Sequence, residues 1–174
     1  MSIFIMAQIV GLIGIVCGMI TFHTKDMRGA RKWKLTIDIL WSLHYLLLGA
    51  FTGFGTSMIA ACREIVFLND HKKICQLKMW PWFFIVLNFI SSAITWRGIY
   101  SIFPAISAVL ATFIFWQKDI RRGRVMGLAV NSLMFLYDVF AGSFMGMVTE
   151  TLSFVSTLFA IYRFRKGLER QVQN

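Results

Sequence analysis

The sequence predicts an all-α integral membrane protein with seven transmembrane helices, built as two parallel three-helix bundles (helices 1-2-3 and 5-6-7) joined by linker helix 4. Three observations predict this class: the composition, the spacing of apolar stretches and charges, and an internal repeat. Of the 174 residues, 57% are hydrophobic and 15% are charged, whereas soluble domains average roughly 45–50% apolar and ~25% charged residues. The 17 Phe and 6 Trp exclude a disordered chain, because disordered segments are poor in aromatic residues.

Seven apolar stretches approach the length of a membrane span. A bilayer core of ~30 Å requires ~20 apolar residues in a helix. The stretches cover residues 3–22, 35–51, 54–69, 79–95, 99–116, 125–141 and 145–162. The connections between them are too short for a soluble domain, so we expect residues 1–174 to form a single membrane domain.

The distribution of basic residues predicts the orientation. Arg97 lies alone on one side of the seven-helix arrangement, and Arg63 lies within a span. The other sixteen Lys and Arg fall on the opposite side, in residues 25–34, 72–78, 118–124 and 163–170. Because cytoplasmic loops collect Lys and Arg, we expect a multi-pass protein of the inner (cytoplasmic) membrane, with its N-terminus outside and residues 163–174 as a cytoplasmic tail.

The same distribution excludes several classes of function. Basic loops that determine topology lie against anionic lipid headgroups, so the partner we expect is the lipid bilayer and not a nucleic acid. Three cysteines, Cys17, Cys62 and Cys75, show no CxxC spacing and predict neither a disulfide framework nor a metal site. The motifs of hydrolases, P-loop proteins and dinucleotide enzymes are absent. We therefore expect no catalytic residues and no cofactor.

An internal repeat of 93 residues predicts how the helices are grouped. Residues 3–66 match residues 96–159 at 15 of 64 positions without a gap. The matches in the loops are the most specific, and they pair Lys25-Asp26 with Lys118-Asp119, Arg31 with Arg124, Gly49 with Gly142, and Gly53 with Gly146. We expect a first repeat over 3–69, a linker helix over 79–95 and a second repeat over 96–162. Parallel repeats with a solute site near the midplane between them are a transporter architecture.

Small residues recur in the first helix of each repeat. Gly11, Gly14 and Gly18 lie in the first stretch, and the matching positions of the fifth hold Pro104, Ser107 and Ala111. Small residues let membrane helices approach closely, which predicts a packing seam. Alternatively, Gly11 and Pro104 act as hinges, because proline removes a backbone hydrogen bond within a helix.

The chain resembles the YgjV-type bacterial inner-membrane proteins. The residues that carry the resemblance are Ala7-Gln8, Gly11, Asp26 with Arg28, His44 with Leu47-Leu48-Gly49, Arg63, and Arg163-Phe164. Its three-plus-one-plus-three plan also resembles the SWEET and PQ-loop transporters. The resemblance implies a SWEET-like fold in the cytoplasmic membrane and names no substrate.

Polar side chains within the spans give the candidate substrate-binding residues. A charged side chain in a bilayer costs at least ~2.5–3.5 kcal/mol, so it normally faces protein or a water-filled cavity. The candidates are Asp38, Trp41, His44, Ser57, Arg63, Glu64, Asn131, Asp138, Glu150, Ser153 and Thr157. Positions 57/60/64 and 150/153/157 each share a helix face, and the resemblance implies that these two stripes line the pocket. Aromatic rings beside carboxylates suit a sugar, a nucleoside or an organic cation.

Each candidate also has a structural interpretation. Arg63 and Glu64 are not expected to stack on each other as sequence neighbours. Arg63 either pairs with Asp38, or with Glu64 of another helix face, and holds the first bundle together, or it contacts an anionic or polar solute directly. His44 is either a hydrogen-bonded core residue or a group that changes protonation. For Asp138 and Glu150 we expect a solvated outer vestibule in preference to a proton relay.

Two functions fit these observations. The first is transport of a small polar solute by alternating access through a midplane pocket between the repeats. The second is a non-transporting membrane sensor, or an assembly or scaffold protein, whose pocket is closed. A polar cavity between the bundles favours the first, and a dry midplane filled with Phe and Met favours the second. The sequence leaves open the substrate, the ion coupling and whether the chain forms a homo-oligomer.

Overall fold

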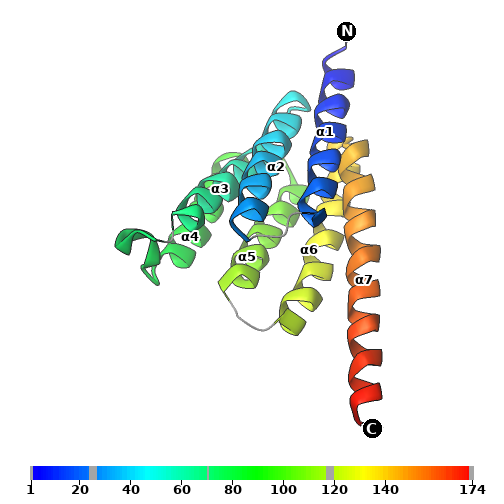
Figure 1. The fold of residues 1–174 in the computed structure, drawn as a ribbon. Coiled ribbons are helices and arrows are strands. Elements are labelled where there is room, and N and C mark those ends of the chain that lie inside the picture. Colours follow the sequence, from blue (N-terminus) through cyan, green and yellow to red (C-terminus); the bar gives the residue numbers. More distant parts are fainter. Residues whose placement is uncertain (1, 24–26, 70, 117–119, 173–174) are drawn as a thin grey trace.

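The structure is a computed structural model that describes residues 2–23, 27–69, 71–116 and 120–172. Within these residues all regular structure is helical (Figure 1). The α-helices are α1 (Ile3–His23), α2 (Met27–Leu47), α3 (Phe51–Leu68), α4 (Trp80–Ile94), α5 (Ile102–Trp116), α6 (Ile120–Ala141) and α7 (Phe144–Val172). Two short 3-10 helices, η1 (Lys73–Gln76) and η2 (Ile99–Ser101), precede α4 and α5.

The helices form two groups of three. In the first group α2 packs against both α1 and α3, and in the second α6 packs against both α5 and α7. Helix α4 contacts α3 and α5, one from each group. The groups also meet directly where α1 contacts α7 and α3 contacts α5. In Figure 1, α1 and α7 lie side by side, and the N- and C-termini lie at opposite ends of the molecule.

The distribution of side chains identifies a membrane protein. Polar and charged residues outnumber apolar ones among the buried side chains of the described residues. Large apolar side chains cover the exterior; for example, Phe89 is 58% exposed and Phe159 is 65% exposed. Four helical segments are long and apolar enough to cross a membrane: Ile3–Ile20, Phe51–Leu68, Arg122–Ala141 and Phe144–Tyr162. An apolar exterior around a polar interior suits a chain whose solvent is lipid.

The turn between α2 and α3 lies earlier than predicted. The sequence places the break at Thr52-Gly53, but α2 ends at Leu47 and α3 begins at Phe51. Gly49 has a φ of +69°, a conformation that glycine adopts without a Cβ clash and that commonly ends a helix. Thr52 and Gly53 are therefore buried in the first turn of α3.

Three other helix ends extend beyond the apolar stretches. Helices α2 and α6 begin at Met27 and Ile120, within the basic segments, and α7 continues to Val172 through the predicted tail. Lys and Arg are good helix formers, so the helices continue where the apolar pattern stops. The apolar stretch of a sequence indicates which part of a helix can lie in lipid. It does not indicate where the helix begins or ends.

The two turns at the ends of α2 and α6 have the same geometry. Gly49 and Gly142 are 93 residues apart and have φ values of +69° and +66°. In both turns the residue after the glycine donates its amide, at 2.9 Å, to the carbonyl four residues before the glycine: Ala50 to Tyr45, and Ser143 to Asp138. The Lys-Asp pairs that also match at this spacing, Lys25-Asp26 and Lys118-Asp119, lie outside the described residues.

At the other end of each group, an arginine joins the second helix to the third. Arg31 on α2 donates from Nη1 to the carbonyl of Phe67 on α3 at 2.6 Å. Arg124 on α6 donates to the carbonyl of Ala160 on α7 at 3.3 Å. The two arginines are 93 residues apart, and so are the two carbonyl acceptors. Each group thus has an arginine hydrogen bond between its second and third helices at the same position, which we call the arginine tie.

Candidate functional site

A cavity of about 410 Å³ lies between the two groups of helices. Its wall comes from α2, α3, α4, α5, α6 and α7. The polar residues that line it are Lys34, Asp38, Thr56, Ser57, Arg63, Asn88, Ser107, Asn131, Thr149 and Glu150. Small-molecule sites typically enclose ~300–1,000 Å³ and present a few polar groups on an apolar wall, so this cavity has the volume of a metabolite site.

Residues 93 positions apart in the sequence line this cavity in pairs. Six pairs of lining residues are separated by that spacing: Lys34 and Gly127, Ile37 and Val130, Asp38 and Asn131, Trp41 and Met134, Thr56 and Thr149, and Ser57 and Glu150. The cavity therefore takes matching positions from α2 and α6, and from α3 and α7.

The cavity extends toward one end of the molecule. Tyr45 and Pro104 mark its inner limit, near the end of α2 and the start of α5. Lys34, Ile114 and Gly127 mark the other limit, near the start of α2, the end of α5 and the start of α6. The cavity is not enclosed. The side chain of Lys34 is 38% exposed, whereas Tyr45 at the inner limit is 3% exposed. We therefore take the end near Lys34 as the open end.

Six of the eleven predicted binding residues line the cavity. They are Asp38, Trp41, Ser57, Arg63, Asn131 and Glu150. The other five, which are not among its lining residues, are His44, Glu64, Asp138, Ser153 and Thr157. On α7, Thr157 donates to the carbonyl of Ser153 at 2.7 Å, so its hydroxyl is bonded within its own helix.

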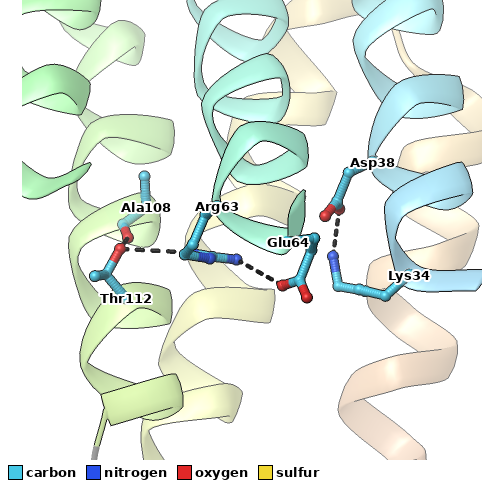
Figure 2. Close-up of polar contacts among 6 residues, drawn as sticks. All are labelled: Lys34, Asp38, Arg63, Glu64, Ala108 and Thr112. Carbon is cyan, nitrogen blue, oxygen red and sulfur yellow. Dashed lines mark hydrogen bonds and ion pairs between the residues drawn. The ribbon is translucent and has the colours of Figure 1, made fainter. Parts of the chain in front are cut away.

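Four charged residues lie between α2 and α3 at the open end (Figure 2). Lys34 pairs with Asp38 one turn along α2. Arg63 lies 3.6 Å from Glu64 (Nη2 to Oε1), with both side chains almost fully buried. Arg63 also donates to Thr112 on α5 at 3.4 Å. Figure 2 shows Glu64 between Arg63 and Lys34, so the charges alternate in sign.

The expectation that Arg63 and Glu64 do not contact each other as sequence neighbours is wrong. Adjacent helical side chains leave the backbone in different directions, but the arginine side chain is long enough to bend back to its neighbour. Burial favours such a contact, because an unpaired charge in a low-dielectric interior is costly. The expected pair between Arg63 and Asp38 is likewise replaced by the pair between Lys34 and Asp38.

On the opposite wall, Asn131 holds the carboxylate of Glu150. With its amide nitrogen facing Glu150, Asn131 of α6 donates to Oε2 at 3.2 Å and accepts from the amide of Phe154 at 3.3 Å. The two residues belong to α6 and α7. A carboxylate held in this way presents its remaining acceptor positions to the cavity.

Beyond the inner limit of the cavity, a set of hydrogen bonds joins the two groups of helices. His44 contacts the carbonyl of Ala7 and the hydroxyl of Ser143, both at 2.7 Å. Tyr45 donates to Asp138 Oδ1 at 2.8 Å. The amide of Gly53 donates to the Tyr137 hydroxyl at 2.9 Å, and Gln8 bonds the backbone of Gly142 and Met145. We call this set the polar layer: Gln8, His44, Tyr45, Gly53, Tyr137, Asp138, Gly142, Ser143 and Met145.

Asp138 does not lie in a solvated vestibule, which corrects the expectation from the sequence. Its exposed fraction is 0%. Tyr45 covers one carboxylate oxygen, and Gly146 lies so close that a Cβ there would lie 2.5 Å from Oδ1. Tyr45, which bonds Asp138, lies on α2 in the other group of helices. The pattern of apolar residues along α6 alone therefore does not indicate that Asp138 is buried.

A second, smaller cavity of about 210 Å³ lies on the other side of the polar layer. Arg97, Tyr100, Tyr137 and Phe140 contribute to its wall. Tyr137 lines this cavity while Tyr45 lines the larger one, and their ring centroids are 5.7 Å apart. The two tyrosines thus form the partition between the cavities.

The predicted packing and hinge residues differ in their surroundings. A Cβ at Gly11 would lie 2.7 Å from Met145 Cβ and 3.0 Å from His44 Nδ1, whereas one at Gly14 would lie 3.6 Å from Trp41. At Gly18 no described atom lies within 4 Å of that position. Pro104 is the third residue of α5. In this first turn its missing amide hydrogen breaks no α-helical bond.

Sequence reasoning missed several lining residues. Asn88 is the single amide side chain in the apolar run 79–95, and a polar residue at membrane depth points to a site by default. The linker helix stands outside the predicted repeat, so comparison of the two copies does not single out Asn88. Thr56 and Thr149 are identical residues 93 positions apart, and this identity is the feature of the sequence that could have indicated them as lining residues.

These features define an all-helical membrane protein with a polar cavity between two groups of helices. Residues 5–167 match the Imp-YgjV family of bacterial inner membrane proteins. The match covers nearly the whole chain, so the protein belongs to this family of the bacterial inner membrane. No curated protein and no solved structure matches the chain.

Proposed function

We propose that the protein crosses the inner membrane seven times as two parallel three-helix repeats, and that it transports a small polar solute by alternating access. One observation carries the proposal: a polar cavity between the two groups of helices is open at one end, while the polar layer joins the groups at the other. Alternating access requires a cavity that is open on one side and is closed on the other by contacts that can separate, and the hydrogen bonds of the polar layer are such contacts.

The surroundings of α2 support a seventh span. This helix is too polar to qualify by apolar length alone. Its charged residues Lys34 and Asp38 line the cavity, whereas Ile39, Leu43 and Leu46 are 50%, 43% and 42% exposed. A helix with an apolar exterior and charges toward a cavity satisfies the requirements of a transmembrane segment.

Several recurrences at a spacing of 93 residues support the parallel repeats. They comprise the left-handed glycines, the amide bonds of the turns, the arginine ties and the six pairs of lining residues. Side-by-side copies with the same orientation place equivalent residues across a central axis. The cavity then lies on that axis, where a solute would contact both copies.

The charge distribution supports an inward-facing conformation. The open end lies near the starts of α2 and α6, beside the basic segments 25–34 and 118–124. Because such segments stay in the cytoplasm, the open end faces inward, the polar layer lies toward the outside and the C-terminus is cytoplasmic. Among the described residues, the lining contains no Phe and a single Met, which favours transport over a sensor or scaffold with a closed pocket.

Thiol labelling tests alternating access without knowledge of the solute. In a variant with Cys17, Cys62 and Cys75 replaced by serine, Met134→Cys places a thiol in the cavity. A membrane-impermeant maleimide is applied to inverted and to right-side-out membrane vesicles. We expect rapid labelling from the cytoplasmic side and slower labelling from the outside, because a minority of molecules face outward at any time.

Two controls define the outcome. Ala141→Cys, in the smaller cavity, is expected to react from the outside. Leu152→Cys, at a residue that is 57% exposed on the apolar surface of α7, is expected to resist the reagent from both sides because lipid covers it. If Met134→Cys reacts from one side only, even after exhaustive labelling, transport by alternating access is contradicted.

A further inference from the structure

The lining of the larger cavity contains one carboxyl group without a cationic partner. Its charged residues are Lys34, Asp38, Arg63 and Glu150. Lys34 pairs with Asp38, and Arg63 pairs with Glu64. Among the described residues, no cation lies within ion-pair distance of Glu150, whose side-chain partner is the amide of Asn131. Since the charges within each of the two pairs cancel, the net charge of the described lining depends on Glu150.

Two buried acceptor atoms in the same lining also have no partner. Asn88 is 2% exposed, and its Nδ2 donates to the carbonyl of Phe84 at 2.8 Å while its Oδ1 has no hydrogen bond. Asp38 is 6% exposed, and its Oδ2 has none. Buried polar atoms almost always have a partner. Both atoms, like the carboxylate of Glu150, can only accept, so a solute that supplies N–H donors would satisfy them.

The remaining wall suits the apolar part of a cationic molecule. Trp41 and Tyr45, one turn apart on α2, line the cavity. The hydroxyl of Tyr45 is bonded to Asp138, which leaves its ring to face a ligand. Tryptophan and tyrosine rings attract cations within ~6 Å of the ring centroid. Ser107, which is 3% exposed and has an unpartnered hydroxyl, adds a group that either donates or accepts.

We propose that the cavity binds a small organic cation, whose ammonium or amidinium N–H groups bond to Glu150 and Asn88 and whose apolar part faces Trp41. The proposal rests on the transport function and names its class of solute. A sugar would supply hydroxyl donors and leave the charge of Glu150 uncompensated. An anion would bring a second negative charge beside it, which is unfavourable in a cavity removed from water.

Matched ligands test the charge of the solute. The full-length protein is purified in dodecyl maltoside, a detergent without an ammonium group. Its unfolding midpoint is followed by tryptophan fluorescence with 2-phenylethylamine, 2-phenylethanol and 3-phenylpropanoate, and with butylguanidine, pentanamide and pentanoate. We expect the two cations to raise the midpoint, with an apparent affinity at least tenfold higher than that of the neutral and anionic members of each set.

Two substitutions test the residues. Glu150→Gln keeps the size of the side chain and removes its charge, and we expect at least a tenfold loss of affinity for the cations. Thr151→Ala, next to Glu150 on α7 at an exposed position that is not among the described lining residues, should leave the affinity unchanged. Ser107→Ala provides a milder change in the same lining, with an expected loss of two- to fivefold. Size-exclusion chromatography and circular dichroism establish that each variant is folded.

Several outcomes would overturn the proposal. These are equal stabilisation by all members of a set, stabilisation by the carboxylates, no stabilisation by either cation, or cation binding that Glu150→Gln leaves unchanged. Competition by phosphatidylethanolamine but not by free ethanolamine would assign the site to a lipid headgroup instead of a solute. Labelling of Met134→Cys from both sides with no cation binding would retain transport and overturn the solute class. Cation binding with one-sided labelling would retain the site and overturn transport.

Discussion

Tyr45 and Asp138, which are 93 residues apart and equivalent in the proposed repeat, are hydrogen-bonded to each other, with 2.8 Å between the tyrosine hydroxyl and Oδ1. Equivalent residues of two copies related by a two-fold axis can touch only beside that axis. The bond therefore marks where the proposed axis passes. The bond also lies between the two cavities. Tyr45 and Asp138, the residues nearest the proposed axis, would therefore have to separate before a solute could pass to the outside.

Tyr45→Phe should weaken the closure of the polar layer. The substitution removes the hydroxyl that donates to Asp138 Oδ1, and an unsatisfied buried acceptor costs about 1–3 kcal/mol. We expect Met134→Cys to react severalfold faster from the outside in this variant. Tyr162→Phe, at a residue that is 62% exposed, removes a hydroxyl elsewhere and should not change the rate. An unchanged rate in Tyr45→Phe would show that this bond does not limit outward access.

Arg63 and Glu64 should behave as one unit in a double-mutant cycle. Removal of one partner of a buried pair leaves an uncompensated charge and costs about 3–5 kcal/mol. We expect Arg63→Met and Glu64→Gln each to lower the thermal unfolding midpoint strongly. The double variant should be more stable than the sum of the two effects implies. Additive effects would contradict a direct pair and would assign Glu64 to Lys34, its other neighbour in Figure 2.

Two glycines of α1 should respond in opposite ways to alanine. In Gly11→Ala the new Cβ would lie 2.7 Å from Met145 Cβ, so α1 and α7 would have to separate and the unfolding midpoint should fall. Gly18→Ala meets no described atom within 4 Å. Alanine favours a helix over glycine by ~1 kcal/mol, so this variant should be equally stable or more stable. Equal losses in both variants would argue against a close contact at Gly11.

Gly49→Ala and Gly142→Ala should destabilise the protein by similar amounts. Both glycines have a left-handed backbone, and a Cβ at either position meets no described atom within 4 Å. The cost is therefore conformational, about 1–2 kcal/mol for a residue with a side chain. Asparagine, which tolerates this conformation better, should restore part of the stability. A large difference between the two sites in chemical denaturation would contradict equivalent turns.

The proposed orientation predicts the activity of fused reporters. Alkaline phosphatase, which is active only outside the cytoplasm, should be active when fused after Arg97 and inactive when fused after Leu77. Green fluorescent protein fused to the C-terminus should fluoresce, because that end is expected in the cytoplasm. The reverse result at Arg97 and Leu77 would overturn the orientation derived from the basic loops.

The all-helical membrane class was predictable because lipid imposes apolar length on each helix, and the membership of the family confirms the resemblance carried by residues such as His44 and Gly49. Helix ends were less predictable. The turn at Gly49 depends on a backbone conformation, and glycine occurs so often in this chain that hydropathy could not single it out. Thr52, expected in the turn, is instead buried at the start of α3.

The sequence predicts a lining residue well when its place depends on the face of its own helix. It predicts the residue poorly when its place depends on a partner from another helix. Asp38 and Trp41, one turn apart on α2, line the cavity as their spacing indicated. The burial of Asp138 depends on Tyr45, and the place of Asn88 depends on how α4 meets both groups. Such contacts are set by packing between helices, which a single sequence does not encode in any local pattern.

The paired arginine ties have a mechanical consequence. In each half, an arginine fastens the third helix to the second at one end, and a tight glycine turn connects the same two helices at the other. Both ends of the hairpin are thus clamped, which makes each half stiff along its length. If the two groups move relative to each other, we expect the change at the contacts of α1 with α7 and of α3 with α5, while each helix hairpin moves as a rigid body.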